Sequence, residues 1–146
     1  MPASLTSATD FFVKVPTEYD CPLSYHMGIL GDTGMSAYFG MLDIARPSAG
    51  DTVLVSAAGG AVGSIAGQVA KICGARAVGI VGSAEKGRQI IEQFGYDAAI
   101  DRSGDVAAQL RAACPDGVNV YFDNVSGPLL ETVLDHIAPG ARIALC

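Results

Sequence analysis

Short apolar runs alternate with amphipathic segments along the chain from residue 52 onward. The apolar runs predict strands at 52–56, 77–82, 98–100, 118–124 and 141–146. Between them, apolar positions at helical spacing predict helices at 62–73, 84–94, 105–114 and 128–137. Because the strands lack polar alternation, both of their faces are expected to be buried. The pattern therefore predicts an α/β fold with a doubly wound parallel sheet and helices on both faces.

The segment before this series is less regular. A further helix is predicted to begin at a cap formed by Asp32 or Thr33 and to end before Pro47. Its apolar residues at helical spacing are Met35, Tyr38, Phe39 and Leu42. Residues 1–30 hold three prolines and one short apolar run, FFVKV, and are interpreted as a linker or as the remnant of a strand from another domain. Residues 31–146 are expected to form a single domain.

Composition narrows the classes of protein and partner. The net charge of −6 and the absence of a basic run argue against a nucleic-acid partner. Charged residues make up 16% of the chain, against about 25% in soluble domains, so part of the surface is expected to be covered by a cofactor, a domain or a subunit. The four cysteines lack the spacing of a zinc site, which indicates reduced thiols, a cytoplasmic location and no metal. No secretory signal is recognisable, and no membrane span is expected.

A glycine cluster, SAAGGAVG, lies between the first predicted strand and its helix. From Ala58 it follows the pattern A-x-G-x-x-G, with Gly60 and Gly63 in the second and third glycine positions. In dinucleotide-binding turns the second glycine lets the backbone approach a pyrophosphate, and the third permits close helix packing. A close contact between helix and strand would explain the glycines alone. Their place after the first strand of an alternating series favours a dinucleotide site.

The end of the second predicted strand bears on the choice of dinucleotide. NAD-binding proteins usually carry an acid there, whereas this chain has Gly82 and Ser83, followed by Lys86. A small tip leaves room for a 2′-phosphate, to which Ser83 can donate and Lys86 can bring positive charge. Glu85 could take the acidic role or favour the first helical turn, and Lys86 and Arg88 could be solvated surface charges. The missing acid favours NADP over NAD.

Other candidate residues follow from position. Ligands of open parallel sheets bind outside the carboxyl ends of the strands, which singles out Asn124 and Cys146. Asn124 could bind a cofactor or cap a turn, and a cysteine such as Cys146 is more often a small structural residue. The sequence has no phosphate-binding P-loop and no G-x-S-x-G nucleophile elbow. The isolated His26 and His136 are interpreted as structural.

Residues 22–146 resemble the medium-chain dehydrogenase/reductase superfamily, in particular its zinc-free branch of prostaglandin and alkenal reductases. The resemblance rests on LSYHMGILGDTGMSAYFGMLDI, VLVSAAGGAVGSIAGQVAKICGARAVGIVGSAEK, GYDAAID, CPDGVNVYFDNVSG and RIALC. It implies a Rossmann-type domain of an enzyme that uses NADPH to reduce the C=C bond of α,β-unsaturated ketones or aldehydes without a metal. Such enzymes deliver a hydride to the β-carbon of the substrate.

The resemblance also implies roles for particular residues. The phosphate-binding turn of the family falls on Gly60, Ala61, Val62 and Gly63, and its 2′-phosphate lysine on Lys86. The cofactor-binding asparagine falls on Asn124, and the contact on the fifth strand on Cys146. Arg102 stands where the family usually has a tyrosine near the adenosine phosphate. GDTGMSAY replaces the usual GMPGLTAY at the nicotinamide end, which alters the geometry expected there.

The catalytic domain and the C-terminal segment of the family have no counterpart in the sequence, which ends after the fifth strand of a sheet that usually has six. No catalytic side chain can therefore be named, and the chain is expected to bind NADPH weakly and to be inactive in isolation. The full-length protein is expected to be a homodimer. The alternatives are an NADPH-dependent quinone reductase, the enoyl reductase domain of a polyketide synthase, and a non-enzymatic NADP(H)-sensing module.

Overall fold

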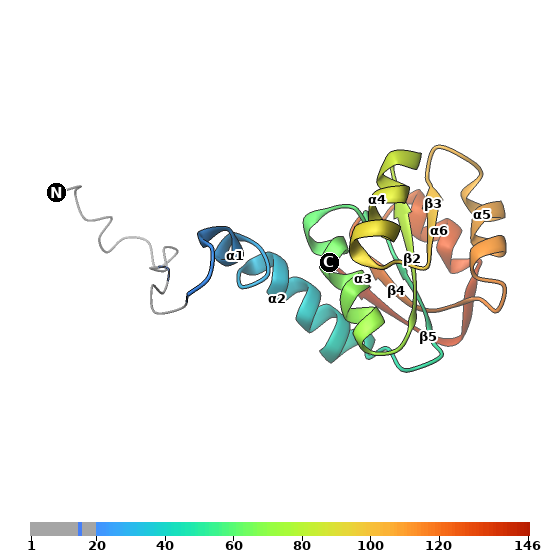
Figure 1. The fold of residues 1–146 in the computed structure, drawn as a ribbon. Helices are drawn as coiled ribbons and strands as arrows, with labels where there is room; N and C mark the ends of the chain where they lie inside the picture. Colours follow the sequence, from blue (N-terminus) through green and yellow to red (C-terminus); the bar gives the residue numbers. More distant parts are fainter. Residues whose placement is uncertain (1–14, 16–19) are drawn as a thin grey trace.

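The computed structural model describes Val15 and residues 20–146, which contain a parallel sheet of five strands (Figure 1). The order across the sheet is β3-β2-β1-β4-β5, and every adjacent pair is parallel. The strands are β1 (Thr52–Val55), β2 (Arg76–Val81), β3 (Ala98–Asp101), β4 (Val118–Asp123) and β5 (Ile137–Leu145). The predicted doubly wound α/β fold is confirmed.

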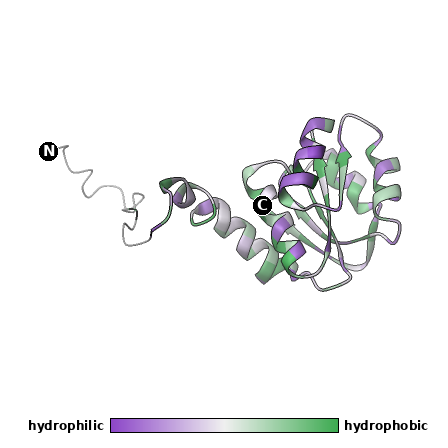
Figure 2. Ribbon diagram, in the orientation of Figure 1, coloured by the Kyte–Doolittle hydropathy of each residue, from purple (hydrophilic) through white to green (hydrophobic). Residues whose placement is uncertain are grey.

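Helices cover both faces of the sheet. Successive strand residues point to opposite faces, and apolar residues on each face pack against helices. Val53 and Val55 of β1 pack with residues of α3 (Ala61–Ile72) and α4 (Ala84–Phe94) in one core cluster. Leu54, between them, packs in a second cluster with residues of α5 (Val106–Ala113) and α6 (Pro128–Leu134). The strands are therefore apolar along most of their length, as Figure 2 shows.

The helix predicted before Pro47 is present, but it begins differently. It runs as α2 (Asp32–Tyr38) and continues directly as a π-helix, η1 (Phe39–Ala45). Its N-cap is Gly31, which makes no side-chain capping bond, so the predicted cap at Asp32 or Thr33 is wrong. Both of those residues lie within the first helical turn.

The face that this helix buries also differs from the one that its large apolar residues suggest. Met35, Tyr38 and Phe39 are each about half exposed. Small residues and one methionine form the buried face instead: Gly34, Ala37, Met41 and Ala45. Small residues allow close approach, as at Gly40, where a Cβ atom would lie 2.5 Å from the Phe122 ring of β4.

A short helix precedes α2. α1 (Leu23–Met27) has no buried residue and lies within the stretch interpreted as a linker. Apart from Val15, the FFVKV run predicted as a strand remnant lies outside the described residues. The boundary between residues 1–30 and 31–146 stays a prediction.

The junction between α6 and β5 corrects two predicted boundaries. α6 ends at Leu134, and Ile137, predicted as helical, is the first residue of β5 and pairs with Val118. Ala138 precedes Pro139, and helical backbone is disfavoured for a residue that precedes a proline. β5 therefore begins four residues before its predicted start at residue 141.

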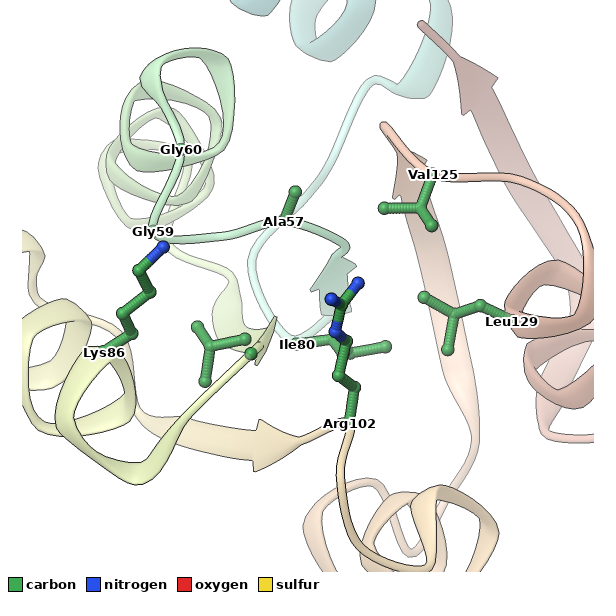
Figure 3. Close-up of a pocket in the computed structure, with 10 residues that line it drawn as sticks. Ala57, Gly59, Gly60, Ile80, Lys86, Arg102, Val125 and Leu129 are labelled. Carbon is green, nitrogen blue, oxygen red and sulfur yellow. The ribbon is translucent and has the colours of Figure 1, made fainter.

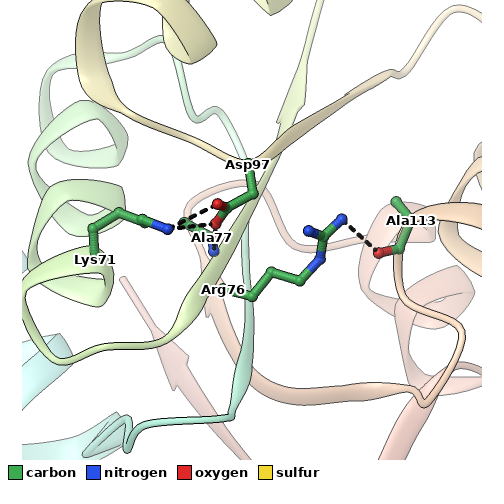
Figure 4. A network of polar contacts seen from close by, with 5 residues as sticks. All are labelled: Lys71, Arg76, Ala77, Asp97 and Ala113. Carbon is green, nitrogen blue, oxygen red and sulfur yellow. Dashed lines mark hydrogen bonds and ion pairs between the residues drawn. The ribbon is translucent and has the colours of Figure 1, made fainter.

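A polar network connects the amino ends of β2 and β3 with α3 (Figure 4). The Asp97 carboxylate accepts hydrogen bonds from Lys71 Nζ at 2.8 Å and from the Ala77 amide at 2.7 Å. Arg76 donates to the Ala113 carbonyl at 3.3 Å. These contacts lie at the opposite end of the strands from the carboxyl edge, and we assign them a structural role.

Candidate functional site

A cavity of about 210 Å³ lies at the carboxyl ends of β1 and β2, beside the residues that follow β3 and β4 (Figure 3). Its position is the one where open parallel sheets bind ligands. The residues that line it are Ala57, Gly59, Gly60, Ile80, Val81, Gly82, Lys86, Arg102, Val125 and Leu129.

The glycine turn forms one wall of this cavity. The left-handed backbone of the turn is at Ala57, with φ of 48°, and Ala58 has no positive φ, so alanine is tolerated where the pattern usually has its first glycine. Gly60 is the N-cap of α3, and a Cβ atom at Gly63 would collide with the Ala57 carbonyl. Gly63 thus permits the helix to begin directly against the turn.

The start of α3 leaves amide donors beside the cavity. The first intrahelical bond runs from the Ser64 amide to the Gly60 carbonyl at 2.9 Å. The amides of Ala61, Val62 and Gly63 precede that bond and have no acceptor within the helix. Such donors, together with the positive end of the helix dipole, favour an anion such as a pyrophosphate.

Two cationic side chains reach the cavity from different elements. Figure 3 shows Lys86 of α4 extending toward Gly59 and the Arg102 guanidinium rising between Ala57 and Leu129. Arg102 also lies against Gly82, where a Cβ atom would be 3.7 Å from its Nε. Among the described residues that line the cavity there is no acid, although the chain carries a net charge of −6. The site is therefore locally cationic and suited to a phosphorylated ligand.

Ser83 and its neighbours are placed differently. Ser83 is the N-cap of α4, and its hydroxyl accepts a hydrogen bond from the Lys86 amide at 3.3 Å. It lines a neighbouring cavity with Arg88 rather than the one that Lys86 lines. Glu85 lies exposed in the first turn of α4. Ser83 thus contributes to the cavity by starting the helix that carries Lys86.

Asn124 and Cys146 lie next to each other at the carboxyl ends of β4 and β5. The Cys146 amide donates to the Asp123 carbonyl at 2.9 Å, and the Cys146 residue is exposed. Asn124 donates from its side-chain Nδ2 to the Ser56 carbonyl at 2.8 Å. Neither residue lines the cavity of Lys86 and Arg102, so the predicted residues form two groups along the carboxyl edge of the sheet.

The carboxylate of Asp123 organises this second group. Its Oδ1 accepts hydrogen bonds from the Ser56 and Tyr121 hydroxyls and from the Val125 and Ser126 amides, at 2.9 to 3.0 Å. Burial raises the pKa of Asp123, but the hydrogen bonds, those from the two amides foremost, outweigh burial and hold the pKa below its ordinary value of 3.8. Asp123 is therefore ionised at neutral pH.

This carboxylate makes stability depend on pH. Since the pKa of Asp123 is lower in the folded than in the unfolded chain, its ionised form contributes fully to stability above pH 3.8, and the contribution is lost as pH falls below 3.8 through the lower pKa of the folded chain. We expect Asp123→Asn to lower the free energy of unfolding by about 1–3 kcal/mol at neutral pH and by less in acid. Urea denaturation across this pH range measures it, with the exposed Asp116→Asn as control. A difference that stays constant in acid would contradict the assignment.

Some site residues were not predicted from the sequence. Val125 and Leu129 supply an apolar wall across the cavity from Lys86 and beside Arg102, and Ser56 and Asp123 form the buried network next to Asn124. Val125 and Leu129 follow the carboxyl end of β4, and open parallel sheets bind ligands at such ends, so their position in the sequence could have indicated a role in the site. Ser56 and Asp123 become neighbours only through the pairing of β1 with β4.

Two further findings concern other site types. None of the helices in residues 20–146 combines the length and apolar character needed to cross a bilayer. In the same part of the chain, no cluster of three or more His, Cys, Asp or Glu residues is arranged to hold a metal ion.

Comparison with known proteins identifies the family. The family model described as zinc-binding dehydrogenase matches residues 61–146, more than half of the chain, and the chain therefore belongs to this family. The 2-alkenal reductase (NADP(+)-dependent) of Nicotiana tabacum is 43% identical over 145 residues, 98% of this chain and 42% of that protein. Prostaglandin reductase 1 of Rattus norvegicus is 44% identical over 137 residues, 91% of this chain and 41% of that protein.

A solved structure gives the same result. CurA of Vibrio vulnificus in complex with NADPH has a TM-score of 0.80 and 44% identity, covering 82% of this chain and 36% of CurA. The resemblance to the branch of prostaglandin and alkenal reductases is confirmed by these relatives. The chain spans about two fifths of the length of the two curated relatives.

Proposed function

We propose that this chain binds NADPH at the carboxyl edge of its sheet and supplies the cofactor half of a reductase that acts on α,β-unsaturated ketones or aldehydes. The observation that carries the proposal is the cavity with two cations and no acid among its described lining residues. An NAD site would usually place an acid at the tip of β2, where Gly82 stands. The NADPH complex of CurA supports the same cofactor.

The proposed binding mode distributes the cofactor along the edge. Lys86 and Arg102 hold the 2′-phosphate by charge-assisted hydrogen bonds, and Val125 and Leu129 contact the adenosine. Gly60 and the first amides of α3, on Ala61, Val62 and Gly63, receive the pyrophosphate. Asn124 and Cys146 lie toward the nicotinamide end. Ser83 acts indirectly, by capping the helix of Lys86.

When bound, the reduced nicotinamide supplies a hydride for the β-carbon of the enone. This chain contributes the binding and orientation of the cofactor, and its described residues form no acid–base constellation that we can assign to substrate. The substrate contacts would come from the part that the relatives have beyond the matched two fifths. We therefore expect the isolated chain to bind NADPH without reducing an enone.

The test is NADPH oxidation, followed by absorbance, with a panel of enones, quinones and saturated alcohols. We expect the gene's full reading frame to oxidise NADPH with enones only, and the 146-residue chain to show no turnover with any of them. Comparable rates with quinones would favour a quinone reductase. Binding of NADPH without turnover by the full reading frame would favour an NADP(H)-sensing module.

Three expectations about the protein's surroundings stay predictions: a homodimer in the full-length protein, a cytoplasmic location, and no nucleic-acid partner. Light scattering of the full reading frame measures the first of these directly.

A further inference from the structure

The orientation of the Asn124 side-chain amide is determined by its surroundings. Nδ2 lies 2.8 Å from the Ser56 carbonyl oxygen, to which it donates. The opposite orientation would place the amide oxygen against that carbonyl, two acceptors facing each other without a proton. The side-chain oxygen of Asn124 is therefore directed away from Ser56, and it can only accept a hydrogen bond.

The main chain of Asn124 is fixed by the Ser56 hydroxyl. This hydroxyl accepts a hydrogen bond from the Asn124 amide at 2.8 Å and donates its own proton to Asp123 Oδ1 at 3.0 Å. Because Asp123 is ionised, it acts only as an acceptor and determines the direction of the hydroxyl proton. Ser56 and Asp123 are both fully buried, so water does not compete for these bonds.

The remaining bonds to Asp123 hold the carboxylate itself in place. Tyr121 donates from its hydroxyl at 2.9 Å, and the Val125 and Ser126 amides donate at 2.9 Å each. Tyr121 and Asn124 are thus attached to the same carboxylate by different routes. Of the two hydroxyls that donate to Asp123, only that of Ser56 also bonds Asn124.

We propose that Ser56 and Asp123 are positioning residues that hold the Asn124 side-chain oxygen as an acceptor for a hydrogen-bond donor on the nicotinamide half of NADPH. The donor is an N–H of the carboxamide or a hydroxyl of the adjoining ribose. This inference rests on the proposed function, since it assumes that NADPH occupies the carboxyl edge of the sheet. The added contact is expected to strengthen binding of the nicotinamide half of NADPH and to leave binding of the adenosine half unchanged.

The test compares two ligands by titration calorimetry on the 146-residue chain: NADPH, and adenosine 2′,5′-bisphosphate, which lacks the nicotinamide half. Loss of one hydrogen bond corresponds to about a three- to tenfold change in Kd. Ser56→Ala is expected to weaken NADPH by this factor and to leave adenosine 2′,5′-bisphosphate unchanged. The double variant Ser56→Ala/Asn124→Ala is expected to bind NADPH no more weakly than Asn124→Ala alone, because Ser56 acts through Asn124.

Tyr121→Phe is the matched control. It removes one of the four hydrogen bonds to the same Asp123 oxygen without touching Asn124, so a purely structural network would respond to it as to Ser56→Ala. We expect Tyr121→Phe to lower the unfolding midpoint and to leave both affinities unchanged. The acetylpyridine analogue of NADPH, which lacks the carboxamide N–H groups, identifies the donor. If Ser56→Ala leaves the affinity for the analogue unchanged, the donor is an N–H of the carboxamide. If Ser56→Ala lowers that affinity, the donor is a hydroxyl of the ribose.

The outcomes separate this inference from the proposed function. Binding of neither ligand by the unmodified chain would reject the proposed function and the inference together. If the unmodified chain binds both ligands, and Ser56→Ala changes both affinities equally or neither, only the positioning role is rejected. An additive loss in the double variant would reject it as well.

Discussion

Lys86→Ala is expected to raise the Kd for NADPH by about 10- to 100-fold, because it removes a charge-assisted contact worth about 1.5–3 kcal/mol. The Kd for NADH is expected to stay the same, since NADH has no 2′-phosphate. Lys86 lines the cavity together with Arg102, and no acid is found among the described lining residues. Calorimetric titration with both dinucleotides measures the two changes.

Arg88→Ala is the matched control for this variant. Arg88 is also an exposed cation of α4, but it lines the neighbouring cavity rather than the one of Lys86. We expect its removal to leave both dissociation constants nearly unchanged. Equal losses of NADPH and NADH affinity in Lys86→Ala would reject the role of Lys86 at the 2′-phosphate.

The largest effect on stability is expected from Gly67→Ala in α3. A Cβ atom at Gly67 would overlap the ring and the hydroxyl oxygen of Tyr96. Tyr96 is buried, and its hydroxyl donates to the Gly63 carbonyl at 2.6 Å, so the ring cannot move aside without losing that bond. Overpacking of about 1–3 kcal/mol and a lost hydrogen bond of about 1 kcal/mol add to roughly 2–4 kcal/mol. Urea denaturation measures the change in the free energy of unfolding.

Two further variants make the stability prediction specific. Gly59→Ala is the control, because a Cβ atom there would meet no atom closer than 3.7 Å, and its stability is expected to stay near that of the unmodified chain. Adding Tyr96→Leu to Gly67→Ala removes the obstructing ring tip and should cost less than the two single changes together. A Gly67→Ala chain as stable as the unmodified one would show that α3 does not pack as described.

The sheet could be predicted from the sequence because each of the five strands contains a short apolar run, and helical segments separate these runs. Boundaries failed where one residue suits two structures. Ile137 continues the apolar spacing of α6, yet it pairs with Val118 as the first residue of β5. In α2 the spacing of large residues predicted a helix but not its buried face. A Cβ atom at Gly34 would collide with the Ile29 carbonyl of the preceding turn, and Ala37 is buried in the core cluster that includes residues of α3.

Most residues of the candidate site could be predicted one by one, but the sequence did not show which of them lie together in one cavity. Lys86 and Arg102 were each recognisable as a phosphate ligand, and only the pairing of β2 with β3 explains how two separate elements serve one cavity. Ser83 lies just after β2, where a small residue was expected beside the 2′-phosphate. In the structure its hydroxyl accepts a hydrogen bond from the Lys86 amide and caps α4. The bonds of Ser56 and Asp123 were not predictable, since they arise between strands far apart in the sequence.

The most direct test of the central claim is the affinity of the unmodified chain for NADPH and for NADH, measured by calorimetry under the same conditions. We predict that NADPH binds at least about tenfold more tightly, the ratio expected from one charge-assisted contact of the 2′-phosphate. Equal affinities, or no binding of either dinucleotide, would contradict the account.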